Sequence, residues 1–212
     1  MMAKSSFFSL MATLATAAAL SFSCSTTRVL EEGQYRLASN KVEVIGDSKF
    51  NTKKVESYIK QKPNSYIIFG WNPFLNLYNW SGRNPDKAIN RLIRSIGTAP
   101  VVYQPSQVEA SIENINRHLE YLGYYGSDVR SDIEVKGRKV NVTYSITLGK
   151  RFRIGEITYS VPDGEFKEDF LADTSATTVR SGDYLSEDAL EKETERCASA
   201  MRRKGYFGFT KN

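Results

Sequence analysis

The sequence has few of the residues that build metal and catalytic centres. Its 212 residues include two cysteines and one histidine. A structural zinc site needs four closely spaced Cys or His ligands, so Cys24, Cys197 and His118 exclude one, and we expect no metal. Cys197 is expected to be a core thiol. A disulfide with Cys24 is the alternative in an exported chain.

Signals for catalysis are equally sparse. His118 lies off the apolar stripe of its helical run, so we expect a surface residue and not a general base. Glu191, Glu193 and Glu195 point in different directions on a helix and are expected to form a solvated face. The sequence has no phosphate loop that ends in Gly-Lys-Ser/Thr. We therefore predict no enzymatic activity, no cofactor and no small-molecule substrate.

An excess of one charge is also missing. The formal net charge is +5, and the basic residues are dispersed. This is too weak to predict a nucleic-acid partner. Two basic clusters, residues 150–153 and 202–204, have two interpretations. They contact lipid headgroups or an acidic partner, or they are solvated, and basic residues in the last turn of a helix are favourable.

Long hydrophobic stretches occur only at the N-terminus. Residues 6–23 are apolar, rich in alanine and uncharged, and they follow Lys4. This pattern predicts a signal peptide over residues 1–23. A retained membrane helix is the alternative, because the stretch is barely long enough to span a bilayer.

The end of this leader has a second feature. Leu20-Ser-Phe-Ser-Cys24 resembles a bacterial lipoprotein signal, in which the cysteine is acylated with fatty acids such as palmitate and becomes the mature N-terminus. The resemblance implies lipidation of Cys24 and a lipidated linker over residues 24–38. Ordinary cleavage near Ala17–Ala19 is the alternative.

One helix ending occurs twice in the sequence. Apolar residues at steps of four and three predict one helix face, and a glycine suits the left-handed turn that ends such a helix. Ser106 and Glu109 have the spacing of a capping box at the start of the first run. The same offsets recur 82 residues later, so that Gly205 corresponds to Gly123. The matched residues are Val108, Ile112, Ile115 and Leu119 in the first run and Leu190, Thr194, Cys197 and Met201 in the second.

Strands are expected around these helices. Residues 40–46 and 152–161 alternate between apolar and polar and precede helical regions, of which the first is 51–61. Residues 127–135 and 140–148 predict a hairpin across a turn at Gly137. The inward side chains of its second strand are Val140, Val142, Tyr144, Ile146 and Leu148. The unit reads β-α-α-β-β, an α+β fold in which helices cover one face of a three-stranded sheet.

The second copy of the unit is expected to be incomplete. It repeats the strand and the two helices, and at residues 205–212 it has only the start of the next strand. We therefore predict a first domain over residues 39–150 and a truncated second domain over residues 151–212, the front piece of a longer protein.

An aromatic-rich insertion, about residues 63–97, enlarges the first domain. Asn84 and Pro85 predict the start of a helix that ends at Gly97. Ile89, Leu92, Ile93 and Ile96 are expected to face inward. The aromatic residues either enlarge the core or form an exposed surface for a client, a partner or a membrane. The candidates for such a surface are Trp71, Phe74 and Trp80.

The repeated unit resembles a known family. The β-α-α-β-β order, the Gly-Tyr-aromatic helix ending and the phrase GKRFRIGEI, Gly149 to Ile157, resemble POTRA (polypeptide-transport-associated) domains of the BamA/TamA outer-membrane assembly family. Residues 181–190, SGDYLSEDAL, resemble the turn before a POTRA second helix. The phrase Gly97–Val102, the insertion and the lipoprotein-like start resemble a lipoprotein branch of that family.

The resemblance implies a periplasmic scaffold at the bacterial outer membrane, anchored by lipid on Cys24. We expect unfolded outer-membrane proteins or assembly-complex subunits to add a strand to an open sheet edge. Residues 127–135 are the expected edge, because 140–148 has the pattern of a central strand. The candidate binding residues are Val129, Ile133 and Val135. The alternative is a stand-alone lipoprotein that braces or regulates an assembly complex without binding clients.

Overall fold

The computed structural model describes residues 26–47, 49–65 and 72–210. The chain divides into two compact units. The first contains the chain up to Lys41 together with Gln61–Val108 and Ser131–Thr143, and the second contains Val42–Lys60, Glu109–Arg130 and the chain from Tyr144 onward. Within the described ranges, no helix combines the length and the apolar character needed to cross a membrane.

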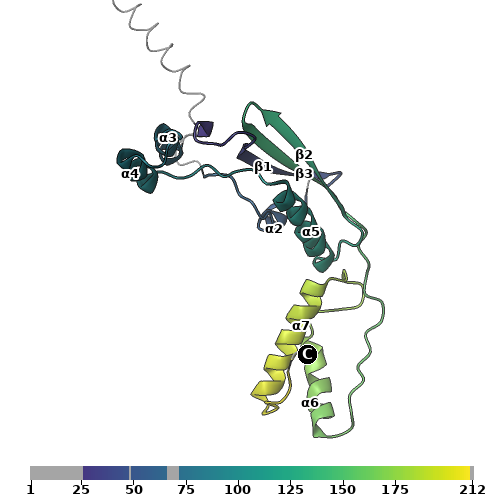
Figure 1. Cartoon of the computed structure of the whole chain (residues 1–212). Helices are drawn as coiled ribbons and strands as arrows, with labels where there is room; N and C mark the ends of the chain where they lie inside the picture. The colour runs from purple at the N-terminus through teal and green to yellow at the C-terminus, as the bar shows by residue number, and fades with distance from the viewer. Residues whose placement is uncertain (1–25, 48, 66–71, 211–212) are drawn as a thin grey trace, which may run out of the picture. The chain divides into compact units, whose positions relative to one another are not determined.

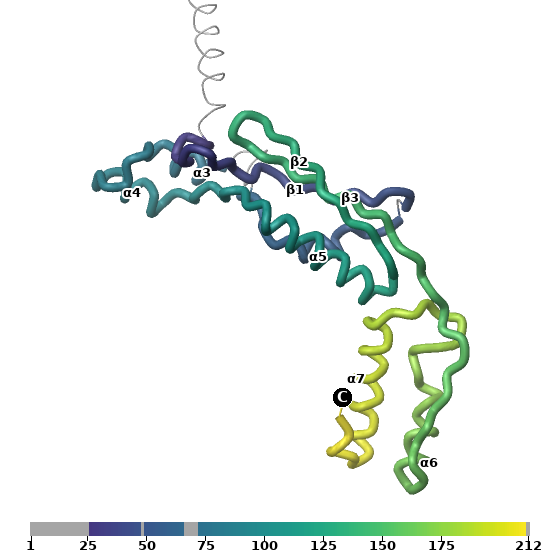
Figure 2. The backbone as a smooth tube through the Cα atoms, turned by 45° about the vertical axis from the view of Figure 1, so that its right-hand side comes forward, coloured from purple at the N-terminus to yellow at the C-terminus, as the bar shows by residue number. Residues whose placement is uncertain are grey.

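Three strands form one sheet in the order β1-β3-β2. β1 spans Arg36–Ile45, β2 spans Asp128–Lys136 and β3 spans Lys139–Thr147. Figures 1 and 2 show α2 and α5 on the same face of this sheet. The alternation of β3 produces the core of that face, and its buried side chains are Val140, Val142, Tyr144 and Ile146. The predicted α+β fold with a central 140–148 strand is therefore confirmed.

The repeated helix is confirmed to the residue. α5 spans Pro105–Tyr121 and α7 spans Glu187–Arg203, so both bounds differ by the predicted 82 residues. Gly123 and Gly205 both have left-handed backbones, with φ of 88° and 100°. Ser106 lies inside the first turn of α5, so the predicted capping position is wrong.

The two helix endings also share their hydrogen bonds. The N–H of Tyr124 donates to the carbonyl of Leu119 at 2.8 Å, and the N–H of Tyr206 donates to that of Met201 at 3.1 Å. Each glycine N–H donates to the residue three positions before it, Glu120 or Arg202. This pair of bonds is the Schellman motif, which satisfies carbonyls that the helix itself leaves unpaired.

The rest of the second copy departs from the first. Residues 152–161 form no strand and make only an isolated bridge between Arg153 and Tyr184, so the predicted strand is wrong. The described part of the last segment, residues 205–210, forms turns. Leu190 is exposed, whereas its counterpart Val108 is buried. A strand needs a hydrogen-bonding neighbour along its length, but the backbone bonds that this segment makes with other described residues are confined to Phe152 and Ile154, which pair with residues 182–185.

A compact helix pair organises the end of the second unit. α6 spans Glu165–Asp173, is continued by the 3₁₀ turn η2 at Thr174–Ala176, and packs against α7. Tyr206, the first aromatic residue after Gly205, packs edge-on against Phe166 with ring centroids 5.1 Å apart. Its hydroxyl donates to Asp169 at 2.8 Å. In the second copy, the Gly-aromatic ending thus returns an aromatic ring to the helix layer.

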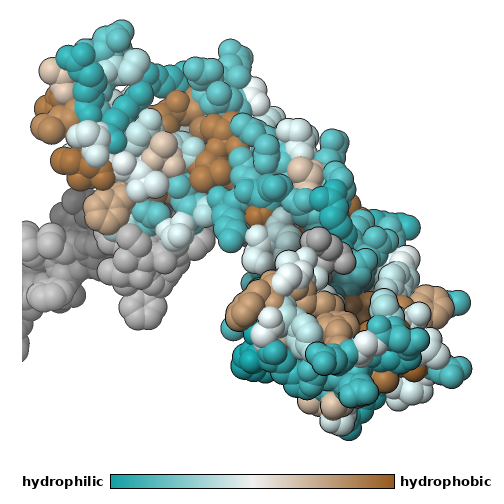
Figure 3. Space-filling view, turned by 90° about the horizontal axis from the view of Figure 1, so that it is seen from below, coloured by the Kyte–Doolittle hydropathy of each residue, from teal (hydrophilic) through white to brown (hydrophobic). Residues whose placement is uncertain are grey.

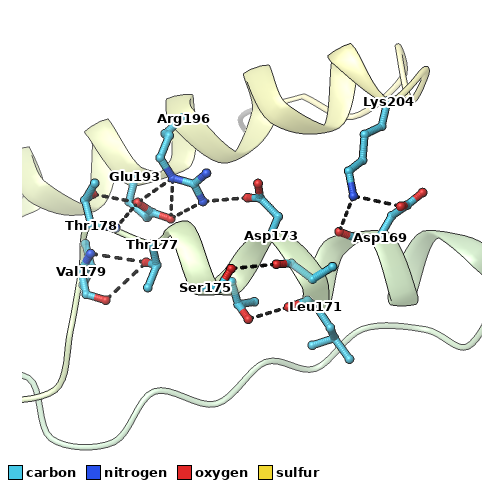
Figure 4. A network of polar contacts seen from close by, with 12 residues as sticks. Asp169, Leu171, Asp173, Ser175, Thr177, Thr178, Val179, Glu193, Arg196 and Lys204 are labelled. Carbon is cyan, nitrogen blue, oxygen red and sulfur yellow. Dashed lines mark hydrogen bonds and ion pairs between the residues drawn. The ribbon is translucent and has the colours of Figure 1, made fainter.

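An ion-pair network joins these helices (Figure 4). Arg196 on α7 contacts Asp173 of α6 and Glu193 of α7, each at 2.8 Å. The second carboxylate oxygen of Glu193 accepts from the backbone N–H of Thr178 at 2.8 Å. Glu193 is therefore the centre of a network, and its predicted place on a solvated face is wrong.

The insertion forms a helical hairpin of α3, Pro73–Trp80, and α4, Ala88–Ile96. The side chain of Asn72 caps α3 by accepting from the N–H of Leu75 at 2.8 Å. Arg94 on α4 donates to Ser81 at 3.0 Å and to the carbonyl of Gly82 at 2.7 Å, which ties α4 to the end of α3.

Two predictions for helices need correction. Ile89, Leu92 and Ile96 are exposed on α4, so their expected inward orientation is wrong, although the helix does end at Gly97. α2 spans only Lys53–Glu56, which is shorter than the predicted 51–61.

Candidate functional site

The candidate site is the free edge of β2. A two-residue turn at Gly137–Arg138 joins Lys136 at the end of β2 to Lys139 at the start of β3. In such a hairpin, the two residues that flank the turn face each other and exchange hydrogen bonds, and every second pair does the same. Glu134 lies opposite Asn141 in this register, in agreement with the 3.4 Å bond between their side chains. The even-numbered residues of β2 therefore pair with β3.

The odd-numbered residues consequently direct their backbone N–H and C=O groups away from β3. These residues are Val129, Ser131, Ile133 and Val135. Among the described residues, β2 has β3 as its single strand neighbour. The outward groups form a row of donors and acceptors that an extended segment can pair with.

Two apolar side chains accompany this row. Ile133 is 43% exposed and Val135 is 53% exposed, whereas Val129 is buried. Residues 132–136 are exposed at every position. The predicted binding residues thus differ, because Val129 can offer only backbone, while Ile133 and Val135 also offer apolar surface.

The other face of β2 is charged. Arg130 pairs with Asp128 at 2.7 Å, and Lys136 pairs with Glu134 at 2.8 Å. The hydrogen bond from Lys136 is the main reason that the pKa of Glu134 lies below its ordinary value. Charged side chains on an edge strand discourage edge-to-edge aggregation, and the backbone edge remains accessible.

The opposite edge of the sheet, formed by β1, is covered at its first residues. The N–H of Leu37 in β1 donates to the carbonyl of Val101, and the N–H of Tyr103 donates to that of Tyr35, both at 2.8 Å. Residues 101–103 therefore run along the first residues of β1. The strand predicted from the sequence starts at residue 40, whereas β1 starts at Arg36, and the sequence pattern does not indicate the covering segment. Among the described residues, no comparable segment is bonded along the outer edge of β2.

Two amide side chains hold this covering segment in place. Asn64 donates to the carbonyl of Ala99 at 2.9 Å and accepts from the N–H of Val101 at 3.0 Å. Gln61 donates to the carbonyl of Val102 at 2.6 Å and accepts from the N–H of Gln104 at 3.1 Å. The sequence reading did not identify them. Their only signal is a pair of amide residues on either side of Pro63.

The other predicted residues lie elsewhere. Phe74 and Trp80 are exposed on α3, and Trp71 and Cys24 fall outside the described residues. His118 is not free at the surface. It is half-buried and stacked on Tyr58 with ring centroids 4.0 Å apart, and this burial lowers its pKa.

The described residues show no candidate metal site, and the arginines of one basic cluster contact a tyrosine ring. Residues 26–47, 49–65 and 72–210 contain no group of His, Cys, Asp and Glu side chains placed to hold a metal ion. In the basic cluster at residues 150–153, Arg151 and Arg153 lie over the ring of Tyr184, at 3.9 and 4.3 Å from its centroid.

A comparison with protein families decides the classification. The family POTRA, described as surface antigen variable number repeat, matches residues 38–149, just over half of the chain. The chain belongs to the POTRA family. The resemblance predicted from the sequence is thereby confirmed for the region that contains β1, β2 and β3.

The chain is also similar to solved structures of POTRA domains, at low sequence identity. The chain is similar to POTRA1-2 of the periplasmic domain of Omp85 from Anabaena, with 12% identity, a TM-score of 0.36, and coverage of 83% of this chain and 84% of that one. It is similar to POTRA3-5 of BamA from Haemophilus influenzae, with 11% identity, a TM-score of 0.29, and coverage of 87% and 92%. A search of the curated proteins found no match.

Proposed function

We propose that this POTRA chain is a periplasmic scaffold of an outer-membrane protein assembly or translocation factor, which binds unfolded client or partner segments by strand addition to β2. One observation carries the proposal: β2 is an open edge with exposed Ile133 and Val135. Membership of the POTRA family supports the scaffold role. A lipid on Cys24 would hold the chain at the periplasmic face of the outer membrane.

Main-chain pairing suits a general assembly factor. The backbone N–H and C=O groups that pair with β2 are the same in nearly every client segment, so the affinity depends little on the client sequence. Ile133 and Val135 lie two residues apart on one face, where alternate apolar residues of an added strand can meet them. This edge chemistry binds segments in extended form and requires no reacting side chain.

Proline at position 133 tests the edge directly. Ile133→Pro removes an outward N–H and leaves the bonds between β2 and β3 in place, because proline is tolerated where the N–H faces solvent. We expect client affinity to fall about tenfold, from the lost hydrogen bond and apolar contact. Photo-crosslinking to a urea-unfolded outer-membrane β-barrel protein, diluted into buffer, measures the effect.

Two controls separate backbone pairing from folding and from side-chain loss. Ile133→Thr keeps the N–H and the β-branched shape, and it should retain most of the crosslinking. Circular dichroism should show that Ile133→Pro remains folded. Unchanged crosslinking in a folded proline variant would contradict the proposal. Recovery of folded assembly subunits without any client crosslink would instead indicate a bracing lipoprotein.

A further inference from the structure

The helical hairpin α3–α4 presents large apolar side chains to solvent. Trp80 is 73% exposed, Ile89 is 66% exposed and Leu92 is 62% exposed. Ile96 and Phe74 are also exposed, and we call these five exposed side chains the hairpin surface. Figures 1 and 2 show both helices away from the sheet, and Figure 3 shows hydrophobic side chains at the surface of the end that α4 occupies.

α4 is amphipathic in a way that suits a membrane surface. Ile89, Leu92 and Ile96 follow steps of three and four and share one helix face. Lys87 and Arg91 lie one turn apart on the opposite side. A short helix with apolar residues on one face and basic residues on the other is typical of helices that lie in the lipid–water interface.

The local charge favours an anionic partner. Residues 81–97 contain four basic residues and one acidic residue, Asp86. Arg94 is engaged with Ser81 and Gly82, so Lys87 and Arg91, on the other side of α4, supply the charge that attracts lipid phosphates. The exposed Trp80 adds a side chain that prefers the level of lipid headgroups, because its ring is apolar and its indole N–H is polar.

The N-terminal end of the described chain lies against the same hairpin. The N–H of Val29 donates to the buried Asn79 of α3 at 3.4 Å, and the guanidinium of Arg83 donates to the carbonyl of Arg28 at 3.4 Å. Cys24 precedes Arg28 by four residues, a reach of at most about 14 Å. An acyl chain at Cys24 would therefore keep the hairpin close to the bilayer.

We propose that the α3–α4 hairpin docks on an anionic phospholipid surface. Trp80, Ile89 and Leu92 enter the headgroup region, and Lys87 and Arg91 attract lipid phosphates. This contact goes beyond strand addition and uses other elements than β2. It would fix the orientation of the first unit at the membrane, which a lipid attached at one residue does not do by itself.

Trp80 itself is the probe for the test. The sequence has two tryptophans, so a Trp71→Phe background leaves Trp80 as the only one. The full chain is mixed with vesicles of phosphatidylcholine and phosphatidylglycerol that carry brominated acyl chains. We expect the vesicles to quench Trp80 fluorescence. Leu92→Asp should need an about tenfold higher lipid concentration for the same quenching, because a charge replaces an inserting apolar side chain.

A matched variant controls for a general effect of a new carboxylate. Ile45→Asp changes a residue of β1 that is 61% exposed, and vesicles should quench Trp80 in this variant as strongly as in the parent. The Lys87→Glu, Arg91→Glu double variant should lose about tenfold on anionic vesicles and change little on phosphatidylcholine alone. Circular dichroism checks that every variant is folded.

The readout is local, so binding through the N-terminal segment does not imitate it. Trp80 that stays unquenched on vesicle-bound chain would overturn the proposal, and so would equal quenching in a folded Leu92→Asp variant. Client crosslinking at β2 is measured separately, so failure of one proposal does not affect the other.

Discussion

Replacing Arg196 with alanine is expected to destabilise the α6–α7 layer by about 3 kcal/mol. The side chain of Arg196 is 25% exposed and its guanidinium holds Asp173 and Glu193, whose side chains are 15% and 18% exposed. Without it, two poorly hydrated carboxylates face each other with no cation between them. Hydrogen exchange of the α7 amides, followed by mass spectrometry, measures the opening of this helix.

A second arginine of α7, Arg202, provides a matched control. Arg202→Ala removes the same side chain from an exposed position of α7, and it should change stability by no more than about 0.5 kcal/mol. Arg196→Met combined with Glu193→Gln should recover part of the loss, because it removes the charges of Arg196 and Glu193 together and leaves one carboxylate, Asp173, instead of two. Equal protection of α7 in Arg196→Ala and in the parent would show that the network adds nothing.

The same network predicts a dependence of stability on pH. Burial disfavours the charged form of Glu193, but hydrogen bonds from Arg196 and Thr178 outweigh it and lower its pKa from 4.5 to about 2. A folded-state pKa below the unfolded value means that the contribution is complete above pH 4.5 and disappears as the pH falls towards 2. On the order of 3 kcal/mol should be lost in this window.

Thermal unfolding followed by circular dichroism between pH 5 and pH 2 measures this loss. Glu193→Gln should be less stable than the parent at pH 5 and should change less on acidification. Asp169 also has a lowered pKa, chiefly through Lys204, and contributes in the same direction. Some acid sensitivity should therefore remain in Glu193→Gln. Parallel curves for variant and parent would contradict the assigned role of Glu193.

Elements with a local signal could be predicted from the sequence. α5 and α7 each combine an apolar stripe with a glycine that must adopt positive φ, and both helices lie where the pattern indicates. β3 alternates over its whole length, which only a strand with one buried face requires. Because β3 is expected in the centre of a three-stranded sheet, β2 is expected at an edge, as the strand order β1-β3-β2 shows.

Features that depend on a distant partner could not be predicted. The alternation of residues 152–161 is that of a strand, but among the described residues only Arg153 finds a bridge partner. The stripe of Ile89, Leu92 and Ile96 looks like a core face, because periodicity shows amphipathicity and not what covers it. Glu193 bonds to Arg196, three residues later on the same helix, and to Thr178 in the loop before α7. The spacing along a helix can suggest the first partner, but it cannot reveal the second.

The candidate edge shows the same division. Residues 128–136 could be identified as a strand, but the cover over the other edge depends on Gln61 and Asn64, whose side chains bond backbone about 40 residues away. The choice of β2 as the binding edge therefore stays a prediction. The pairing of residues 101–103 with the start of β1 adds a physical reason for it that the sequence pattern does not contain.

Gly149→Ala is expected to destabilise the second unit by about 3 kcal/mol, because its new carbon has no room. A Cβ at Gly149 would lie 2.1 Å from the carbonyl oxygen of Tyr125 and 2.7 Å from the backbone nitrogen of Ser127. Tyr125 and Lys150 exchange two backbone hydrogen bonds of 3.0 Å at this place. The atoms that would have to move are backbone, so no side-chain rotation relieves the overlap.

The second glycine of the same phrase is the control. Gly155 has nothing within 4 Å of the position of a Cβ and has no positive φ, so Gly155→Ala should change stability by about 0.5 kcal/mol or less. Urea unfolding followed by circular dichroism compares the two variants. If both behave alike, the close approach of Gly149 to Tyr125 is not what the phrase requires. If only Gly149→Ala unfolds early, the first glycine of GKRFRIGEI is there to let two backbone segments pair.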